Sequence, residues 1–158
     1  MRTPVRAALL AVALAAASLL TSVPASADHA ENDQYVSLTT DATVTLTRRG
    51  DLLVTGTYWC TPQPYDGIRI DVFVSQPVND TVLAPLRYGE GSVTGTCDGT
   101  TKPYRVLVTS EDGRRFSARR SAHHEVDPTL CVAQQCTGGV FESWGGEVDV
   151  VRWRGGRL

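Results

Sequence analysis

The feature that most constrains this chain is a two-residue alternation of apolar and polar side chains, which recurs from Tyr35 onward in short blocks. The clearest block covers residues 68–76, and its apolar positions on one face are Ile68, Ile70, Val72 and Val74. Successive side chains of a β-strand point to opposite faces, so this pattern predicts strands, whereas a helix would repeat about every 3.6 residues. Gly, Pro, Asp and Asn separate the blocks, as they do in turns. We therefore expect an all-β domain.

The same pattern predicts the positions of the other strands. Their expected ranges are residues 42–47, 51–60, 90–97, 104–110, a run that includes 116–122, and 146–153. Proline-containing residues 61–67 are expected to form a loop, and residues 77–85 a connection with a short edge strand. The pair Asp127-Pro128 is expected to break its run.

Strands at this spacing, joined by short turns and by no helical crossover, favour a particular class of fold. We predict an immunoglobulin-like antiparallel two-sheet sandwich of about seven to nine strands. A closed β-barrel is the alternative, because it also buries one face of every strand.

The N-terminus has the three parts of a secretory signal peptide. Arg2 and Arg6 precede an uncharged apolar run at residues 7–20, and Ala25-Ser26-Ala27 has the small residues that signal peptidase accepts. The apolar run is 14 residues long, shorter than the roughly 18 to 20 that span a bilayer. We therefore predict a signal peptide at 1–27 with cleavage after Ala27, a flexible leader at 28–37 and a single domain at 38–158. The protein is expected to be secreted, with no membrane anchor.

The four cysteines, at positions 60, 97, 131 and 136, all follow the predicted cleavage site. An even number of cysteines in an oxidising compartment predicts two disulfides, and three pairings are formally possible. Cys131 and Cys136 are separated by four residues, which suits a bridge within one loop and leaves Cys60 to pair with Cys97. A zinc site is the competing interpretation, but the spacing is not a Cys-x-x-Cys pair.

The charge balance excludes some partners. The chain carries 15 Lys and Arg against 17 Asp and Glu, a formal charge of −2. Removal of residues 1–27, which contain Arg2 and Arg6, leaves 13 against 17 and a charge of −4. Nucleic acids and anionic membranes are therefore not expected as partners.

Three short segments carry a resemblance to known proteins. The runs Val54-Thr55-Gly56-Thr57-Tyr58-Trp59-Cys60, Val72-Phe73-Val74-Ser75-Gln76 and Cys97-Asp98-Gly99-Thr100 resemble small secreted actinobacterial immunoglobulin-like domains of unknown function. This resemblance implies export and an immunoglobulin-like fold, and it carries no catalytic or binding residues with it.

A more distant resemblance is to apoproteins of the neocarzinostatin type, which are exported sandwiches with two disulfides. One of their bridges closes over four intervening residues, as Cys131 and Cys136 do here. The other departs from the pattern, because both bridges of those carriers close short loops, whereas Cys60 and Cys97 are 37 positions apart.

One cluster, His123-His124 with Glu125 and Asp127, combines imidazole and carboxylate groups. Adjacent residues of a strand point to opposite faces, so the two histidines cannot bind one metal ion unless a bulge reorients them. The sequence contains no Gly-x-Ser-x-Gly, His-Glu-x-x-His, P-loop or dinucleotide-binding motif. We predict no catalytic residue, no cofactor and no metal site.

Three aromatic residues are the candidate binding residues. Trp59, Phe73 and Tyr65 fall on or near faces that the alternation directs outward, where rings can stack on a sugar or a small planar ligand. We therefore expect a non-enzymatic extracellular binding module whose partner is a protein, a glycan or a small molecule. The alternatives are a small-ligand carrier with a cleft between its sheets and a metal-assisted hydrolase that uses His124.

Overall fold

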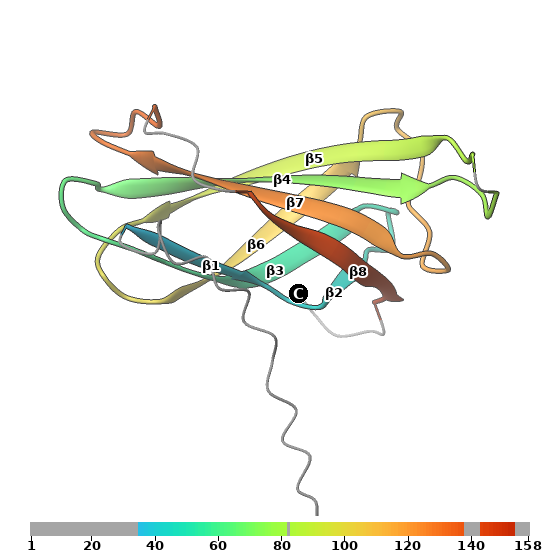
Figure 1. Ribbon diagram of the computed structural model, residues 1–158, viewed down its shortest axis with the longest axis horizontal. Coiled ribbons are helices and arrows are strands. Elements are labelled where there is room, and N and C mark those ends of the chain that lie inside the picture. The colour runs from blue at the N-terminus through green and yellow to red at the C-terminus, as the bar shows by residue number, and fades with distance from the viewer. Residues whose placement is uncertain (1–34, 82, 138–142, 154–158) are drawn as a thin grey trace, which may run out of the picture.

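The computed structural model describes residues 35–81, 83–137 and 143–153, and its regular elements are all β-strands (Figure 1). The strands are β1 Val36–Thr40, β2 Thr43–Leu46, β3 Leu52–Cys60, β4 Gly67–Pro77, β5 Leu86–Thr96, β6 Lys102–Ser110, β7 Ala122–Cys131 and β8 Trp144–Arg152. The all-β prediction is confirmed. The signal peptide predicted at 1–27 lies outside the described residues. β1 begins at Val36, which is fully buried, two residues before the expected start of the domain at 38.

Hydrogen-bonded pairing joins seven of the strands into a ring. The order is β3-β2-β8-β7-β4-β5-β6, and β6 pairs back with β3 to close it. Strand β1 is extra to the ring and pairs with the second half of β3, beyond the part of β3 that pairs with β2. All pairings are antiparallel except that between β2 and β8.

The predicted immunoglobulin-like two-sheet sandwich is therefore wrong, and the closed barrel is the fold that forms. A sandwich leaves free edges on both of its sheets. Here β8 pairs with both β2 and β7, and β6 pairs with both β3 and β5. The seven strands of the ring therefore form one closed sheet. The alternation could not distinguish the two folds, because it shows which face of a strand is buried but not which strands meet at their edges.

Glycines on the inward face of β5 permit the closure against β6. A Cβ atom added at Gly89 would lie 2.6 Å from the carbonyl oxygen of Thr109, and one at Gly91 would overlap the carbonyl oxygen of Leu107. Glycine within a strand often marks such a close approach of another backbone. The seam between β5 and β6 thus depends on the absence of side chains at these two positions.

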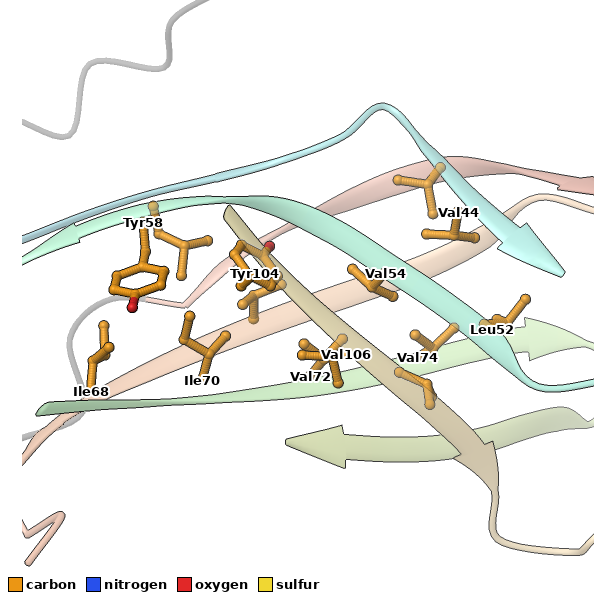
Figure 2. Close-up of a cluster of buried hydrophobic side chains, with 14 of the residues drawn as sticks. Val44, Leu52, Val54, Tyr58, Ile68, Ile70, Val72, Val74, Tyr104 and Val106 are labelled. Carbon is orange, nitrogen blue, oxygen red and sulfur yellow. The ribbon is translucent and has the colours of Figure 1, made fainter. Parts of the chain in front are cut away.

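Inward side chains from the strands fill the barrel. Figure 2 shows labelled residues of β2, β3, β4 and β6 pointing into one interior, with two tyrosines, Tyr58 and Tyr104, among the aliphatic side chains. The Tyr104 hydroxyl lies 2.9 Å from the Thr40 hydroxyl, and the Tyr58 hydroxyl donates to the carbonyl of Thr96 over 3.4 Å. Both buried phenols therefore have the polar partner that burial requires.

Both predicted disulfides are confirmed, Cys60 with Cys97 and Cys131 with Cys136. Strands β5 and β6 pair only at Gly89 and Glu90, so the hydrogen-bonded seam does not extend to the Cys97 end of β5. At that end the long bridge ties β5 to the last residue of β3. Two disulfides are typical of proteins that fold in an oxidising compartment. Within the described ranges, the structure contains no helix of the length and hydropathy needed to cross a membrane.

A strand was predicted to include residues 116–122, but β7 begins only at Ala122. The residues before it form a loop, which the side chain of Gln76 holds in place. The Gln76 side chain is 1% exposed, and its amide group donates to the carbonyls of Ser117 over 2.8 Å and Arg120 over 3.2 Å. Its oxygen accepts the N–H of Ser117 over 2.7 Å. A buried side chain thus takes the place of a neighbouring strand, and Phe116 enters the core from the loop.

Two proline-based expectations also differ from the structure. Strand β7 continues through Pro128, which lies opposite Ile70 of β4. Pairing between β7 and β8 extends only to Val126, so the missing N–H of Pro128 costs no hydrogen bond on that edge. In the segment 77–85 no edge strand appears among the described residues, because β4 runs to Pro77 and a turn leads directly into β5.

Candidate functional site on the outer face of β4, β5 and β7

Strands β4, β5 and β7 lie together along one side of the barrel (Figure 1), and their outward side chains form rows across it. In one row, Phe73 of β4 lies between Glu90 of β5 and Glu125 of β7. In the next row, Ser75 lies between Tyr88 and His123. We call these six residues the outer face.

The two aromatic rings of the outer face are open to solvent. Phe73 is 43% exposed and Tyr88 is 52% exposed. They occupy diagonal positions on adjacent antiparallel strands, for which Cβ atoms are about 7 to 8 Å apart. This separation is within reach of aromatic side chains, so one partner can cover both rings.

The surroundings of Phe73 are acidic. Glu90 and Glu125 flank it on neighbouring strands, so their backbones lie about 10 Å apart, with the ring between them. Asp71 follows on the same face of β4, where it forms an ion pair with Arg69 at 2.7 Å. The charges of Arg69 and Asp71 thereby offset each other. The two glutamates beside Phe73 leave this part of the face net negative.

Two shallow hollows adjoin Phe73. One of about 130 Å³ is lined by Phe73, Tyr88, Glu111, His123 and Glu125, together with backbone neighbours. The other, of about 330 Å³, is lined by Arg69, Asp71, Phe73 and Glu90, together with residues of β5 and β6. Because Phe73 lines both, its ring stands between two depressions whose walls carry carboxylates.

A buried acceptor lies in the row next to Phe73. Among the described residues, Oδ1 of Asp127 is the one buried side-chain oxygen or nitrogen without a hydrogen-bond partner. Asp127 lies on β7 directly opposite Asp71 of β4, in the row next to Phe73. This oxygen is shielded from solvent, so it does not serve as an acceptor for a partner on the outer face.

The structure separates the three aromatic residues singled out from the sequence. Phe73 belongs to the outer face. The Trp59 indole, on β3, donates to the carbonyl of Gly99 over 2.8 Å and is partly buried. Tyr65 packs edge-on against Tyr35, with ring centroids 6.1 Å apart. Trp59 and Tyr65 therefore support local structure, and a shared binding surface for all three stays a prediction that the geometry does not favour.

Sequence reasoning did not place Tyr88, Glu90 or Glu125 beside Phe73. Tyr88 was overlooked because β5 was expected to begin at 90, whereas it begins at Leu86. The available signal was the alternation of Tyr88, Glu90 and Ser92 with Gly89 and Gly91, which places every side chain of this stretch on one face.

His123 and His124 lie on opposite faces of β7, as their adjacency predicted. His123 is exposed, whereas His124 is 7% exposed and its Nδ1 lies 2.9 Å from the carbonyl oxygen of Gly146. In the part of the chain that the structure describes, no group of three or more His, Cys, Asp or Glu is arranged to hold a metal ion. The metal-assisted hydrolase thus gains no support from this cluster.

Burial of His124 predicts a pH-dependent stability. Desolvation is the largest cause that lowers the pKa of His124 below its ordinary value of 6.5, so the unfolded chain takes up a proton at higher pH than the folded one. Stability is then complete above pH 6.5 and falls as the pH drops from 6.5 toward the lowered pKa, by at most about 1.4 kcal/mol per pH unit. Urea unfolding between pH 7.5 and 5 measures this slope.

The variant His124→Asn, which keeps a donor near the carbonyl of Gly146 but cannot titrate, should flatten the slope. The matched control His123→Asn, at the exposed neighbour, should retain the wild-type slope. Equal slopes in all three proteins would show that His124 is not the group responsible.

Comparisons with known proteins add little to this geometry. Neither protein-family models nor curated proteins match the chain. Among solved structures, the chain is similar to DesR, a β-glucosidase from Streptomyces venezuelae in complex with D-glucose, at 18% identity and a TM-score of 0.42. The match covers 72% of this chain and 15% of that chain. A likeness this distant carries no argument about function, and the resemblances to actinobacterial and neocarzinostatin-type domains stay predictions.

Proposed function

We propose that this protein is a non-enzymatic extracellular binding module, and that its outer face binds a Lys- or Arg-bearing segment of a protein partner. The observation that carries the proposal is the exposed ring of Phe73 between Glu90 and Glu125. An ammonium or guanidinium group over that ring would meet the negative face of the π system and a carboxylate on either side.

The energetics of this arrangement favour a cation. A cation over an exposed aromatic ring gains about 0.5 to 1 kcal/mol, and more as the partner removes water from the contact. Glu90 and Glu125 add attraction from two directions. The exposed ring of Tyr88 offers a second apolar surface, against which the methylene groups of a Lys or Arg side chain can pack.

A glycan fits the same surface less well. Stacking of a sugar on Phe73 or Tyr88 would use the aromatic rings, but a neutral sugar gains nothing from the net charge of the carboxylates. Charge complementarity therefore selects a basic protein segment over a neutral glycan.

Export belongs to the same proposal. The predicted signal peptide at 1–27, with cleavage after Ala27, would deliver the domain to an oxidising compartment, where Cys60–Cys97 and Cys131–Cys136 form. An exposed face on a barrel with two disulfides suits contact with another extracellular protein, because the scaffold loses little freedom on binding.

Titration with a fluorescently labelled octa-arginine peptide at low salt tests this function. We expect saturable binding that weakens as salt is added, because the contact is largely electrostatic. The double variant Glu90→Gln, Glu125→Gln and the single variant Phe73→Ala should each weaken binding by about tenfold.

The matched control is Asp66→Asn, Asp149→Asn, which removes the same charge from exposed positions that line neither hollow beside Phe73. It should bind the peptide nearly as well as wild type. An equal loss in the control would mean that overall charge, and not the outer face, attracts the peptide. Binding to neutral glycans on an array, with no binding to the peptide, would also contradict the proposal.

A further inference from the structure

A separate hollow lies on another side of the barrel, on the outward surface of β2, β3 and β6 and the residue that follows β8. It has a volume of about 380 Å³, and its lining includes Leu53, Leu107 and Trp153. Register places Thr45 opposite Leu53, and Leu53 opposite Leu107, so these three residues form a row across three adjacent strands. We call this site the Trp153 hollow.

The surface of the Trp153 hollow is mainly apolar. Leu107 is 50% exposed, although it lies in the middle of β6. Val151, which pairs with Thr45 from the other side, is 42% exposed and extends the same row. Trp153 is fixed at one wall by its backbone N–H, which donates to the carbonyl of Leu46 over 3.1 Å. Apolar side chains held open in a concave site favour a ligand with an apolar body.

Cationic groups line the rim of this apolar surface. The guanidinium of Arg48 lies over the Trp153 ring, 4.7 Å from its centroid, and Arg49 lines the same hollow. Among the described residues of the lining, Asp51 is the one carboxylate. Among the described residues, no ion pair involves Arg48 or Arg49. The site is therefore net positive.

The positive charge continues past the tryptophan. Arg48 and Trp153 also line an adjoining hollow, whose other charged residues are Arg115 and Arg152. The stacked pair thus forms a partition with arginines on both sides. This end of the barrel has the opposite charge to the acidic outer face, in a chain whose net charge is negative.

From these observations we infer that the Trp153 hollow binds a small anionic molecule with a planar or chain-like apolar body, such as an aromatic or long-chain carboxylate or sulfonate. The body lies against Leu53, Leu107 and Trp153, and the anionic group pairs with Arg49 beside the stacked Arg48. Guanidinium groups bind carboxylates and sulfonates through charge-assisted hydrogen bonds, which an uncharged analogue cannot form.

This site differs from the carrier cleft considered from the sequence. That cleft was expected between two sheets, whereas the interior of the barrel is filled by its core and the Trp153 hollow lies outside it. It is also separate from the outer face, with which it shares no residue. Failure of either proposal would leave the other standing.

Fluorescence titration with 8-anilinonaphthalene-1-sulfonate, an aromatic sulfonate, and with its uncharged analogue N-phenyl-1-naphthylamine tests the inference. We expect the folded protein to bind the sulfonate more tightly than the uncharged analogue by about tenfold. Arg49→Gln should remove most of that difference in affinity, because it weakens the binding of the sulfonate and leaves the binding of the uncharged analogue unchanged. Leu107→Ser should weaken the binding of both compounds, because both use the apolar surface of the hollow.

The matched control is Arg119→Gln, at an exposed arginine that lines neither hollow beside Trp153. It should bind both compounds as wild type does. Circular dichroism of each variant establishes that it is folded, since the sulfonate also binds partly unfolded chains. Equal affinity for the two compounds in wild type, or sulfonate binding unaffected by Arg49→Gln, would overturn the inference.

Discussion

Replacement of Gly91 by alanine is expected to destabilise the protein by about 3 kcal/mol, the upper part of the usual range for overpacking. The added methyl group would overlap the carbonyl oxygen of Leu107 on β6. A backbone atom cannot turn aside as a flexible side chain can, so β5 and β6 would have to separate. Because these strands close the ring, the loss should appear in urea unfolding as a lower midpoint.

Gly146→Ala is the control for that variant. Gly146 also lies within a strand, but an added Cβ would meet no atom within 4 Å. Alanine there should be neutral or stabilising by up to about 1 kcal/mol, because it restricts the unfolded chain. If Gly91→Ala were as stable as Gly146→Ala, β5 and β6 would not approach each other as closely as the closed barrel requires.

Removal of the Cys60–Cys97 bridge is the second large effect. The variant Cys60→Ala, Cys97→Ala releases a bridge between residues 37 positions apart, and the loss of loop-closure entropy predicts a cost of about 4 kcal/mol. Both cysteines are almost fully buried, so the alanines also leave unfilled space. The bridge acts where β5 and β6 no longer pair, and it ties β5 covalently to β3 at that end, beside the hydrogen bond from Tyr58 to Thr96.

The short bridge provides the comparison for the long one. Cys131→Ala, Cys136→Ala opens a loop of sequence separation 5, for which the same estimate gives about 2 kcal/mol. Urea unfolding of both variants under identical conditions measures the difference. A smaller loss for the long bridge than for the short one would contradict its assigned role at the open end of the seam.

The strands and bridges could be predicted from sequence because they depend on local signals. In β4 the alternation from Ile68 to Val74 identifies both the strand and its buried face. The spacing of Cys131 and Cys136 selects one of three pairings. Closure of the barrel depends instead on a contact between Gly91 and Leu107, and no pattern within either strand shows which strand its edge will meet.

Tertiary contacts also override local signals in two places. Phe116 has the alternation of a strand residue, yet the buried amide of Gln76 binds the backbone of its segment and holds it as a loop. Proline usually interrupts a strand, yet β7 continues through Pro128. It is tolerated there because β7 has no hydrogen-bonded partner on the β8 side at that position. In both cases the deciding group is distant in sequence.

The candidate site was predicted only in part for the same reason. Phe73 could be placed outward from its own strand. Its grouping with Glu90 and Glu125 depends on the register of β4 with β5 and with β7, which the sequence does not specify. Trp59 has an equally outward position on β3, but its indole is committed to the carbonyl of Gly99.

The most direct test of the proposed function is a map of backbone amide chemical shifts during titration of the ¹⁵N-labelled protein with octa-arginine. We expect the largest changes at Phe73, Tyr88, Glu90 and Glu125, and we expect these changes to diminish together as salt is raised. Changes spread evenly over the barrel, or concentrated around Trp153 and away from Phe73, would contradict the proposed function.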